Sequence, residues 1–155
     1  MLLFLDIDGV MVPAKSWKRP DMLGDGFPDF SKTAIHVLKQ LIFEDTTVIL
    51  TTSHKSNYSI EEWKQIFRNR AINISNLICL PANPNNLTRK EEIEHWFYLN
   101  NVQENFIIID DDKSLNELPG FLKEHLVQTS PLIGLTETHL DLARQILQKQ
   151  KPVFA

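Results

Sequence analysis

Short apolar runs alternate along this chain with segments whose apolar residues recur at helical spacing. The apolar runs predict strands at residues 2–7, 46–51, 76–80 and 106–109, and a short edge strand at 126–128. The other segments predict helices at residues 30–43, 59–70, 88–99 and from 136 onward, the middle two opened by capping boxes. This alternation is typical of a doubly wound, Rossmann-like three-layer α/β/α fold with a mainly parallel central sheet.

The composition is that of an ordinary globular protein. Of 155 residues, 43% are hydrophobic and 23% are charged, and we expect a single domain over residues 1–155. The net charge of −4 provides no overall basic field for tight, sequence-independent binding of nucleic acids. The single Cys79 excludes a disulfide framework and a CxxC site within this sequence.

No apolar run approaches the roughly 18 residues that a membrane helix needs. The apolar segment at the start is too short for a signal peptide and leads directly into acidic residues. We therefore expect a cytoplasmic protein that does not contact a membrane.

Two acidic residues, Asp6 and Asp8, follow the first apolar run. Close carboxylates at the end of a buried strand repel each other and are costly to desolvate. A divalent cation with a phosphate beside it removes that conflict, and ligands of open α/β sheets bind at the carboxyl ends of strands. The pair therefore indicates a site, although Asp-x-Asp-Gly could also form only a turn and a helix cap.

Polar residues also lie at the ends of two later strands and at the start of one later helix. They are Thr51-Thr52-Ser53 after the second strand, Lys90 in the first turn of a helix, and Asp110-Asp111-Asp112 after the most apolar strand. Each alone has an ordinary explanation as a strand end, a solvated lysine or a cap. Because the carboxyl ends of parallel strands meet at one edge of the sheet, we expect the three strand-end groups to converge there.

Together, these residue types suit phosphoryl transfer. Mg²⁺ prefers a few carboxylate oxygens together with water and phosphate, and Asp6 and one residue of the 110–112 run can supply them. Asp6 can attack phosphorus to form an aspartyl-phosphate, while Asp8 can protonate the leaving oxygen and then activate water. The hydroxyl of Thr52 and the ammonium of Lys90 can hold the equatorial phosphate oxygens.

In this order, the motifs resemble the haloacid dehalogenase (HAD) superfamily of phosphohydrolases over about residues 1–120. The resemblance implies a Mg²⁺-dependent enzyme with Asp6 as nucleophile and Asp8 as general acid and base. It implies phosphate binding by Lys90 and by Thr52, with Thr51 and Ser53 as alternatives, and Mg²⁺ binding by Asp6, the Asp8 backbone carbonyl, Asp110 and Asp111. Asp112 is either a further ligand or a cap of the segment at Ser114.

The short intervals between motifs imply a member without a cap domain. About 40 residues separate the first two motifs and about 37 separate Thr52 from Lys90, and predicted helices and strands occupy part of both intervals. The resemblance then implies an open cleft for a bulky phosphate, shielded by the loop from Met11 to Phe27. Lys15, Trp17, Lys18 and Arg19 of this loop form a basic and aromatic group suited to nucleic acid, unless Trp17 packs against the body.

The run from Leu50 to Lys55 and the capless layout are also similar to the phosphatase-like domains of RNA-repair proteins. This similarity implies a terminal phosphate on a nucleic-acid end as the substrate. His54 and Lys55 either reach the phosphate or face solvent, and Glu91, Glu92 and Glu94 are expected on a solvated helix face.

Two rival functions remain open. One is a catalytically silent phosphate-recognition or regulatory module with the same fold. The other is a response-regulator receiver domain, whose phosphorylated Asp usually ends the third strand and not the first. The sequence leaves open the substrate, the oligomeric state and a kinase or ligase partner.

Overall fold

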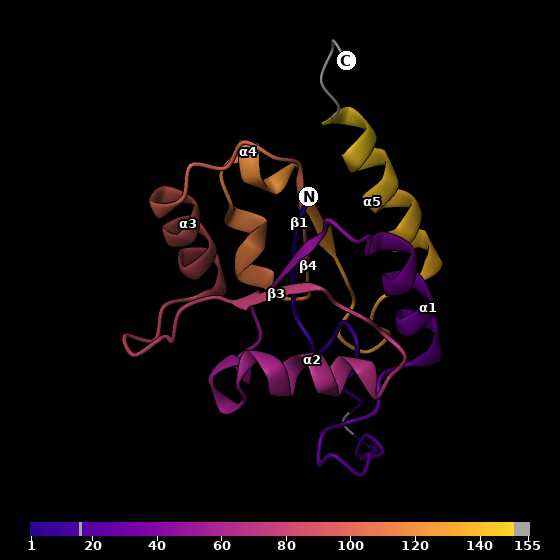
Figure 1. Cartoon of the computed structure of the whole chain (residues 1–155). Coiled ribbons are helices and arrows are strands. Elements are labelled where there is room, and N and C mark those ends of the chain that lie inside the picture. Colours follow the sequence, from indigo (N-terminus) through magenta and orange to yellow (C-terminus); the bar gives the residue numbers. More distant parts are fainter. Residues whose placement is uncertain (16, 151–155) are drawn as a thin grey trace.

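A five-stranded, all-parallel sheet forms the centre of the computed structural model, which describes residues 1–15 and 17–150 (Figure 1). The strands are β1 (Leu2–Leu5), β2 (Thr47–Leu50), β3 (Asn76–Cys79), β4 (Phe106–Asp110) and β5 (Leu126–Gln128). The helices are α1 (Lys32–Leu41), α2 (Ile60–Arg68), α3 (Arg89–Leu99), α4 (Gly120–Lys123) and α5 (Glu137–Lys149), with 3₁₀ turns η1 (Lys55–Asn57) and η2 (Lys113–Glu117).

Helices cover both faces of the sheet, and the side chains of β1, β2 and β4 alternate between two apolar cores. Leu3 and Leu5 belong to the core that includes residues of α1, α2 and α5. Leu2 and Phe4 belong to the second core, with residues of α3, η2 and α4. All residues of β1 and β4 are buried, as expected for central strands of a parallel sheet covered on both faces. The predicted three-layer α/β/α fold is therefore confirmed.

Side-chain caps fix where several helices begin. The predicted capping boxes are present at Ser59 with Glu62 and at Thr88 with Glu91. The cap at Thr88 places Arg89 and Lys90 in the first turn of α3, beside the carboxyl ends of the strands. The start of this helix therefore brings one cation, Arg89, to the carboxyl ends of the strands.

The register of the sheet brings three polar residues level with one another. Strand order is β3-β2-β1-β4-β5, so β1 lies in the centre, and Leu5 pairs with both Leu50 and Ile109. The next residues along these strands are Asp6, Thr51 and Asp110. They meet where the chain leaves β1 toward β2 on one side and later returns to β4 on the other, a switch point at which open α/β sheets bind ligands.

The predicted strands and long helices are confirmed, with ends that differ by a few residues. The short elements η1, η2 and α4 were not predicted. Residues 1–15 and 17–150 contain no inserted cap domain, as predicted. None of their helices is long and apolar enough to cross a membrane. The predicted domain extends to residue 155, and residues 151–155 lie outside the described part.

Candidate active site

Three acidic residues lie together at the carboxyl ends of β1 and β4. Carboxylate oxygens of Asp6, Asp110 and Asp111 all lie within 4.8 Å of one another. Asp6 and Asp110 are buried, whereas Asp111 is only partly buried. The structure thus brings the predicted first and last motifs into one cluster, which we call the acidic cluster.

Asp110 is held through both of its carboxylate oxygens. Its Oδ2 accepts hydrogen bonds from the Thr51 hydroxyl at 3.1 Å and from Nη1 of Arg89 at 2.5 Å. Its Oδ1 accepts from the backbone N–H of Asp112 at 3.1 Å. These bonds fix the orientation of a carboxylate that burial would otherwise make costly.

Arg89 is the cation of the acidic cluster. Its Nη1 lies 3.5 Å from Oδ1 of Asp6, and its Nε lies 3.6 Å from Oε1 of Glu92. Burial opposes the charge of the guanidinium, but the carboxylates of Asp110 and Asp6 outweigh that cost and hold the pKa of Arg89 above its ordinary range. Arg89 therefore stays charged at every pH at which the protein is folded.

A second buried cation lies behind Arg89. Nζ of Lys55 makes a 2.9 Å ion pair with Oε2 of Glu92, and both side chains are at most a tenth exposed. Glu92 was predicted on a solvated helix face, and that prediction is wrong because Glu92 lies between Lys55 and Arg89. Lys55, Glu92 and Arg89 thus form a series of alternating charges that ends at Asp110 of the acidic cluster.

The pKa of Asp6 is strongly shifted in the acidic cluster. Burial and then the charge of Asp110 raise its pKa to about 9, although Arg89 acts in the opposite direction. Burial also raises the pKa of Asp111. The positive charge of Arg89 therefore does not balance the negative charge of three ionised carboxylates. A further cation in the acidic cluster would allow all three to ionise.

The donor set fits a hard divalent cation. Its oxygens are the kind that Mg²⁺ binds, and Mg²⁺ usually keeps only one or two protein carboxylates together with water and phosphate. Because Asp110 already accepts three hydrogen bonds, Asp6 and Asp111 are the members best placed to offer free oxygens. The acidic cluster could hold such an ion.

Gly9 leaves room for Asp111 in this arrangement. Its φ is +79°, a left-handed conformation that favours glycine. A Cβ added at this position would overlap the carboxylate of Asp111. The Asp-x-Asp-Gly motif therefore ends in glycine for two reasons, the turn itself and the space that Asp111 occupies.

Asp8 lies outside the buried group and faces solvent. Its Oδ2 lies 2.8 Å from Nε2 of His54, a contact across 46 positions of the chain. The ring of His54 in turn meets the ring of Phe27 edge to face, with centroids 5.9 Å apart. The backbone after Asp6 thus separates one buried acid from one accessible acid, as two different chemical roles require.

The other predicted phosphate ligands lie in different surroundings. Thr52 is buried and its hydroxyl accepts the N–H of His54 at 3.3 Å, while Ser53 is exposed. The ammonium of Lys90 pairs with Oε1 of Glu94 at 2.7 Å, and the described residues show no hydrogen bond or ion pair between this ammonium and the acidic cluster. The structure therefore does not bring Lys90 to the acidic cluster. Asp112 accepts the N–H of Ser114 at 2.9 Å and caps η2.

A periodic signal in the sequence distinguishes Arg89 from Lys90. Arg89, Ile93 and Trp96 recur at the i, i+4, i+7 spacing of one helix face, and Ile93 is fully buried. Lys90 and Glu94 share a neighbouring face that is more exposed. The spacing of apolar residues along α3 could therefore have indicated that Arg89 points toward the interior of the protein.

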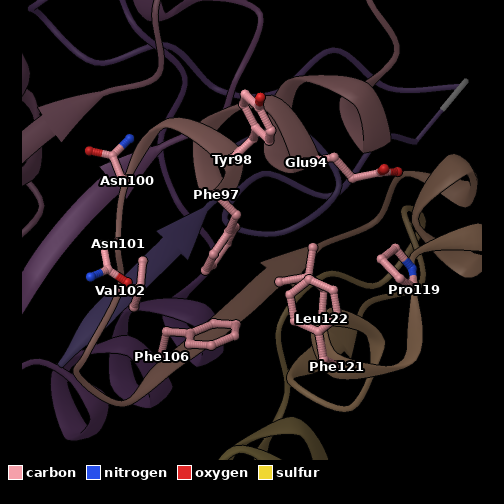
Figure 2. A pocket seen from close by; sticks show the side chains of 10 residues that line it. All are labelled: Glu94, Phe97, Tyr98, Asn100, Asn101, Val102, Phe106, Pro119, Phe121 and Leu122. Carbon is pink, nitrogen blue, oxygen red and sulfur yellow. The ribbon is translucent and has the colours of Figure 1, made fainter.

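A mainly apolar pocket lies away from the acidic cluster. Figure 2 shows side chains of α3 and α4, among them Phe97, Tyr98 and Phe121, around a cavity of about 410 Å³. Phe106, the first residue of β4, is also part of its lining, four residues from Asp110 and so about 13 Å along the strand. This pocket is not the place of the proposed chemistry.

Comparison with known proteins identifies one family. The sequence model of the family described as "HAD domain in Swiss Army Knife RNA repair proteins" matches residues 2–140. No curated protein matches the chain. The match covers all five strands, the acidic cluster and the start of the last helix.

Proposed function

The chain belongs to the family of HAD domains in Swiss Army Knife RNA repair proteins, and we propose that it is a Mg²⁺-dependent phosphatase. Its substrate is a phosphomonoester, and we propose the end of a nucleic-acid strand as the group that carries it. One observation carries this proposal. Asp6 is buried and has a raised pKa, so that it needs a cation to ionise, while Asp8, two residues later, is exposed.

Asp6 is the nucleophile of the proposed reaction. Its carboxylate oxygen attacks phosphorus, the bond from phosphorus to the substrate's oxygen breaks, and an aspartyl-phosphate forms. Mg²⁺, when bound, supplies positive charge to the phosphate and keeps Asp6 ionised despite its burial. Arg89 adds a fixed positive charge beside Asp6 and holds Asp110 in place.

Asp8 moves the protons. It gives a proton to the leaving oxygen in the first step. In the second step it removes a proton from water, the water oxygen attacks phosphorus, and the bond from phosphorus to Asp6 breaks, which releases inorganic phosphate and restores the carboxylate of Asp6. The exposure of Asp8 suits this role, because both the leaving group and water must reach it. The contact with His54 holds the carboxyl group in one orientation.

Hydroxyl groups after β2 bind the phosphate. The hydroxyl of Thr51 donates to Asp110, which leaves Thr52 and Ser53 for this task. Because the Thr52 oxygen accepts the N–H of His54, its own hydrogen is free to be donated. We therefore assign Thr52 to a phosphate oxygen, as the sequence predicts, and give the cationic role predicted for Lys90 to Arg89.

The test is Mg²⁺-dependent release of phosphate from an aryl phosphate and from 3′- and 5′-phosphorylated oligonucleotides, phosphopeptides, nucleotides and sugar phosphates. We expect Asp6→Asn to abolish release while the circular dichroism spectrum and the melting temperature stay close to those of the parent. Asp45→Asn, an exposed acid that precedes β2 at the other edge of the sheet, serves as the control. Full activity of Asp6→Asn would refute the mechanism. Binding of phosphorylated ends without turnover on any substrate would favour the silent recognition module.

A further inference from the structure

The loop between β1 and α1 carries a group of exposed cations and one exposed aromatic ring. Lys15, Lys18 and Arg19 are exposed, and the side chain of Trp17 is 75% exposed. Trp17 therefore does not pack against the body of the protein. Figure 1 shows this loop protruding beyond α2, at the lower end of the molecule in that view.

We infer that the tip of this loop binds the single-stranded part of a nucleic acid whose terminal phosphate enters the acidic cluster. This inference rests on the proposed function and names its substrate class more closely. It assigns Trp17 to stacking on a base and Lys15, Lys18 and Arg19 to backbone phosphates.

The outgoing side of the loop lies directly beside the proposed acid and base. Asp8 and Val12 form an isolated parallel bridge, and the N–H of Gly9 donates to the carbonyl of Val12 at 2.8 Å. Further along, the N–H of Ala14 donates to the carbonyl of Pro131 at 2.7 Å. The chain from Asp8 to Ala14 is thus tied down, and Lys15 follows at once.

The returning side of the loop is fixed by a buried arginine. Arg70 donates through Nη1 to Asp25 at 2.6 Å, through Nη2 to the carbonyl of Phe27 at 2.9 Å, and through Nε to the carbonyl of Pro28 at 3.0 Å. Phe27 also contacts the ring of His54, which lies against Asp8. Both sides of the loop are therefore anchored at the site, so the position of the tip relative to Asp8 is restricted.

A groove connects the tip with the body. It has a volume of about 210 Å³ and includes Lys15, Lys18 and Arg19 in its lining, with Ser31 and the acids Asp21 and Asp29. Asp29 accepts the N–H of Phe30 at 2.9 Å, so part of its hydrogen-bonding capacity is used within the protein. Three cations face two acids here, in a chain whose net charge is −4.

The combination of a flat exposed ring and neighbouring cations favours single strands over duplexes. Bases of a single strand can stack on an aromatic side chain while cations follow the phosphates, whereas the bases of a duplex are already stacked on each other. Asp8 is exposed and pairs with Val12 at the base of this loop, so the end of such a strand can reach it.

Binding is measured with the Asp6→Asn protein, so that the result does not depend on turnover. The probes are fluorescein-labelled single strands of about ten nucleotides, of ribose and of deoxyribose type, with a terminal phosphate at the 3′ or the 5′ end. Fluorescence anisotropy gives the Kd. Quenching of tryptophan emission reports Trp17, because Trp63 is fully buried and Trp96 packs against Phe4 and Phe97.

Two loop variants are compared with a charge-matched control. We expect Trp17→Ala to weaken binding by about tenfold or more and to remove most of the quenching. We expect Lys15→Ala/Lys18→Ala/Arg19→Ala to lower the slope of log Kd against log salt by about 2, at about 0.7 for each phosphate contact. The control is Lys39→Ala/Lys123→Ala/Lys149→Ala, three exposed lysines at helix ends on the opposite edge of the sheet.

Retention of binding by both loop variants would overturn the inference, and so would an equal loss in the control variant. Absence of binding to every strand would overturn it as well. None of these results bears on phosphatase activity itself, which is tested separately with aryl phosphate, although absence of binding to every strand would also count against a nucleic-acid end as the substrate. Conversely, strand binding that depends on the loop, in a protein without phosphatase activity, would support the inference and refute the proposed function.

Discussion

At the scale of single residues, the first turn of α3 offers two cations in different surroundings. Arg89 contacts Asp110 and lies near Asp6, whereas Lys90 pairs with Glu94 near the surface. Electrostatic partners of this kind at a reacting centre contribute about a hundredfold or more to kcat.

We therefore expect Arg89→Ala to lower kcat/KM for aryl phosphate by about a hundredfold or more, and Lys90→Ala to change it by less than about fivefold. Steady-state kinetics at saturating Mg²⁺ check this prediction. An equal loss in both variants, or a larger loss for Lys90→Ala, would contradict the assignment of Arg89.

Gly9 allows a second test at this scale. We expect Gly9→Ala to weaken Mg²⁺ binding strongly, because the new Cβ overlaps the carboxylate of Asp111. Gly26→Ala is the matched control, since its φ of +78° is nearly the same and a Cβ there meets no atom within 4 Å.

Both substitutions force a side chain into the left-handed region and should lower the free energy of unfolding by about 1 kcal/mol. Only Gly9→Ala should shift the Mg²⁺ titration, followed by the change in melting temperature with added metal. Equal titrations of the two variants would show that Asp111 takes no part in metal binding.

At the scale of elements, Arg70 ties the end of α2 to the loop that follows β1. Its side chain is fully buried, and Asp25 is its charged partner. The hydrogen bond from Arg70 holds the pKa of Asp25 well below its ordinary value of 3.8. A carboxyl group whose pKa is lowered by folding stabilises the protein above that ordinary value and loses this contribution as the pH falls through the folded pKa.

We expect Asp25→Asn to lower the free energy of unfolding by about 3 kcal/mol at pH 7, because a buried charge loses its partner. The difference from the parent should shrink below about pH 4, because Asp25 is then protonated in the unfolded chain while it stays ionised in the folded protein. Urea unfolding at pH 7 and at pH 3 measures both values, with Asp21→Asn as an exposed control in the same loop. A difference that does not change between the two pH values would contradict this account.

The strands and the longer helices could be predicted because their signals are local. The apolar runs of β1 and β4 and the capping boxes at Ser59 and Thr88 each lie within a few residues. In a parallel sheet, such strands necessarily bring Asp6 and Asp110 to one edge. The elements η2 and α4 were missed because they are too short to show periodicity.

Contacts between distant side chains could not be predicted in the same way. The pairs Asp8–His54 and Asp25–Arg70 span 46 and 45 positions of the chain. Nothing local to either residue indicates its partner, because the contact depends on how the loop after β1 folds back on α2. From the sequence, Arg89 was not considered, and Lys90 was assigned by residue type without use of the phase of its helix.

At the scale of the whole molecule, the described residues place no inserted domain over the carboxyl ends of the strands, where the first turn of α3 and the loop between β1 and α1 lie. The loop between β1 and α1 lies where a larger insertion would close the site, and its anchors at Val12 and Phe27 keep it beside Asp8. An edge of this kind admits the end of a long substrate, which a closed cap would exclude. The substrate that we propose, a terminal phosphate on a polymer, needs a site that is not closed in this way.

The account depends most on covalent chemistry at Asp6. The direct measurement is rapid acid quenching of the protein during turnover with Mg²⁺ and a phosphorylated substrate, followed by borohydride reduction and peptide mass spectrometry. An aspartyl-phosphate at Asp6 is reduced to homoserine, and we predict homoserine at position 6 in the parent and none in the Asp6→Asn variant. Continued release of phosphate with unmodified aspartate at position 6 would contradict the mechanism.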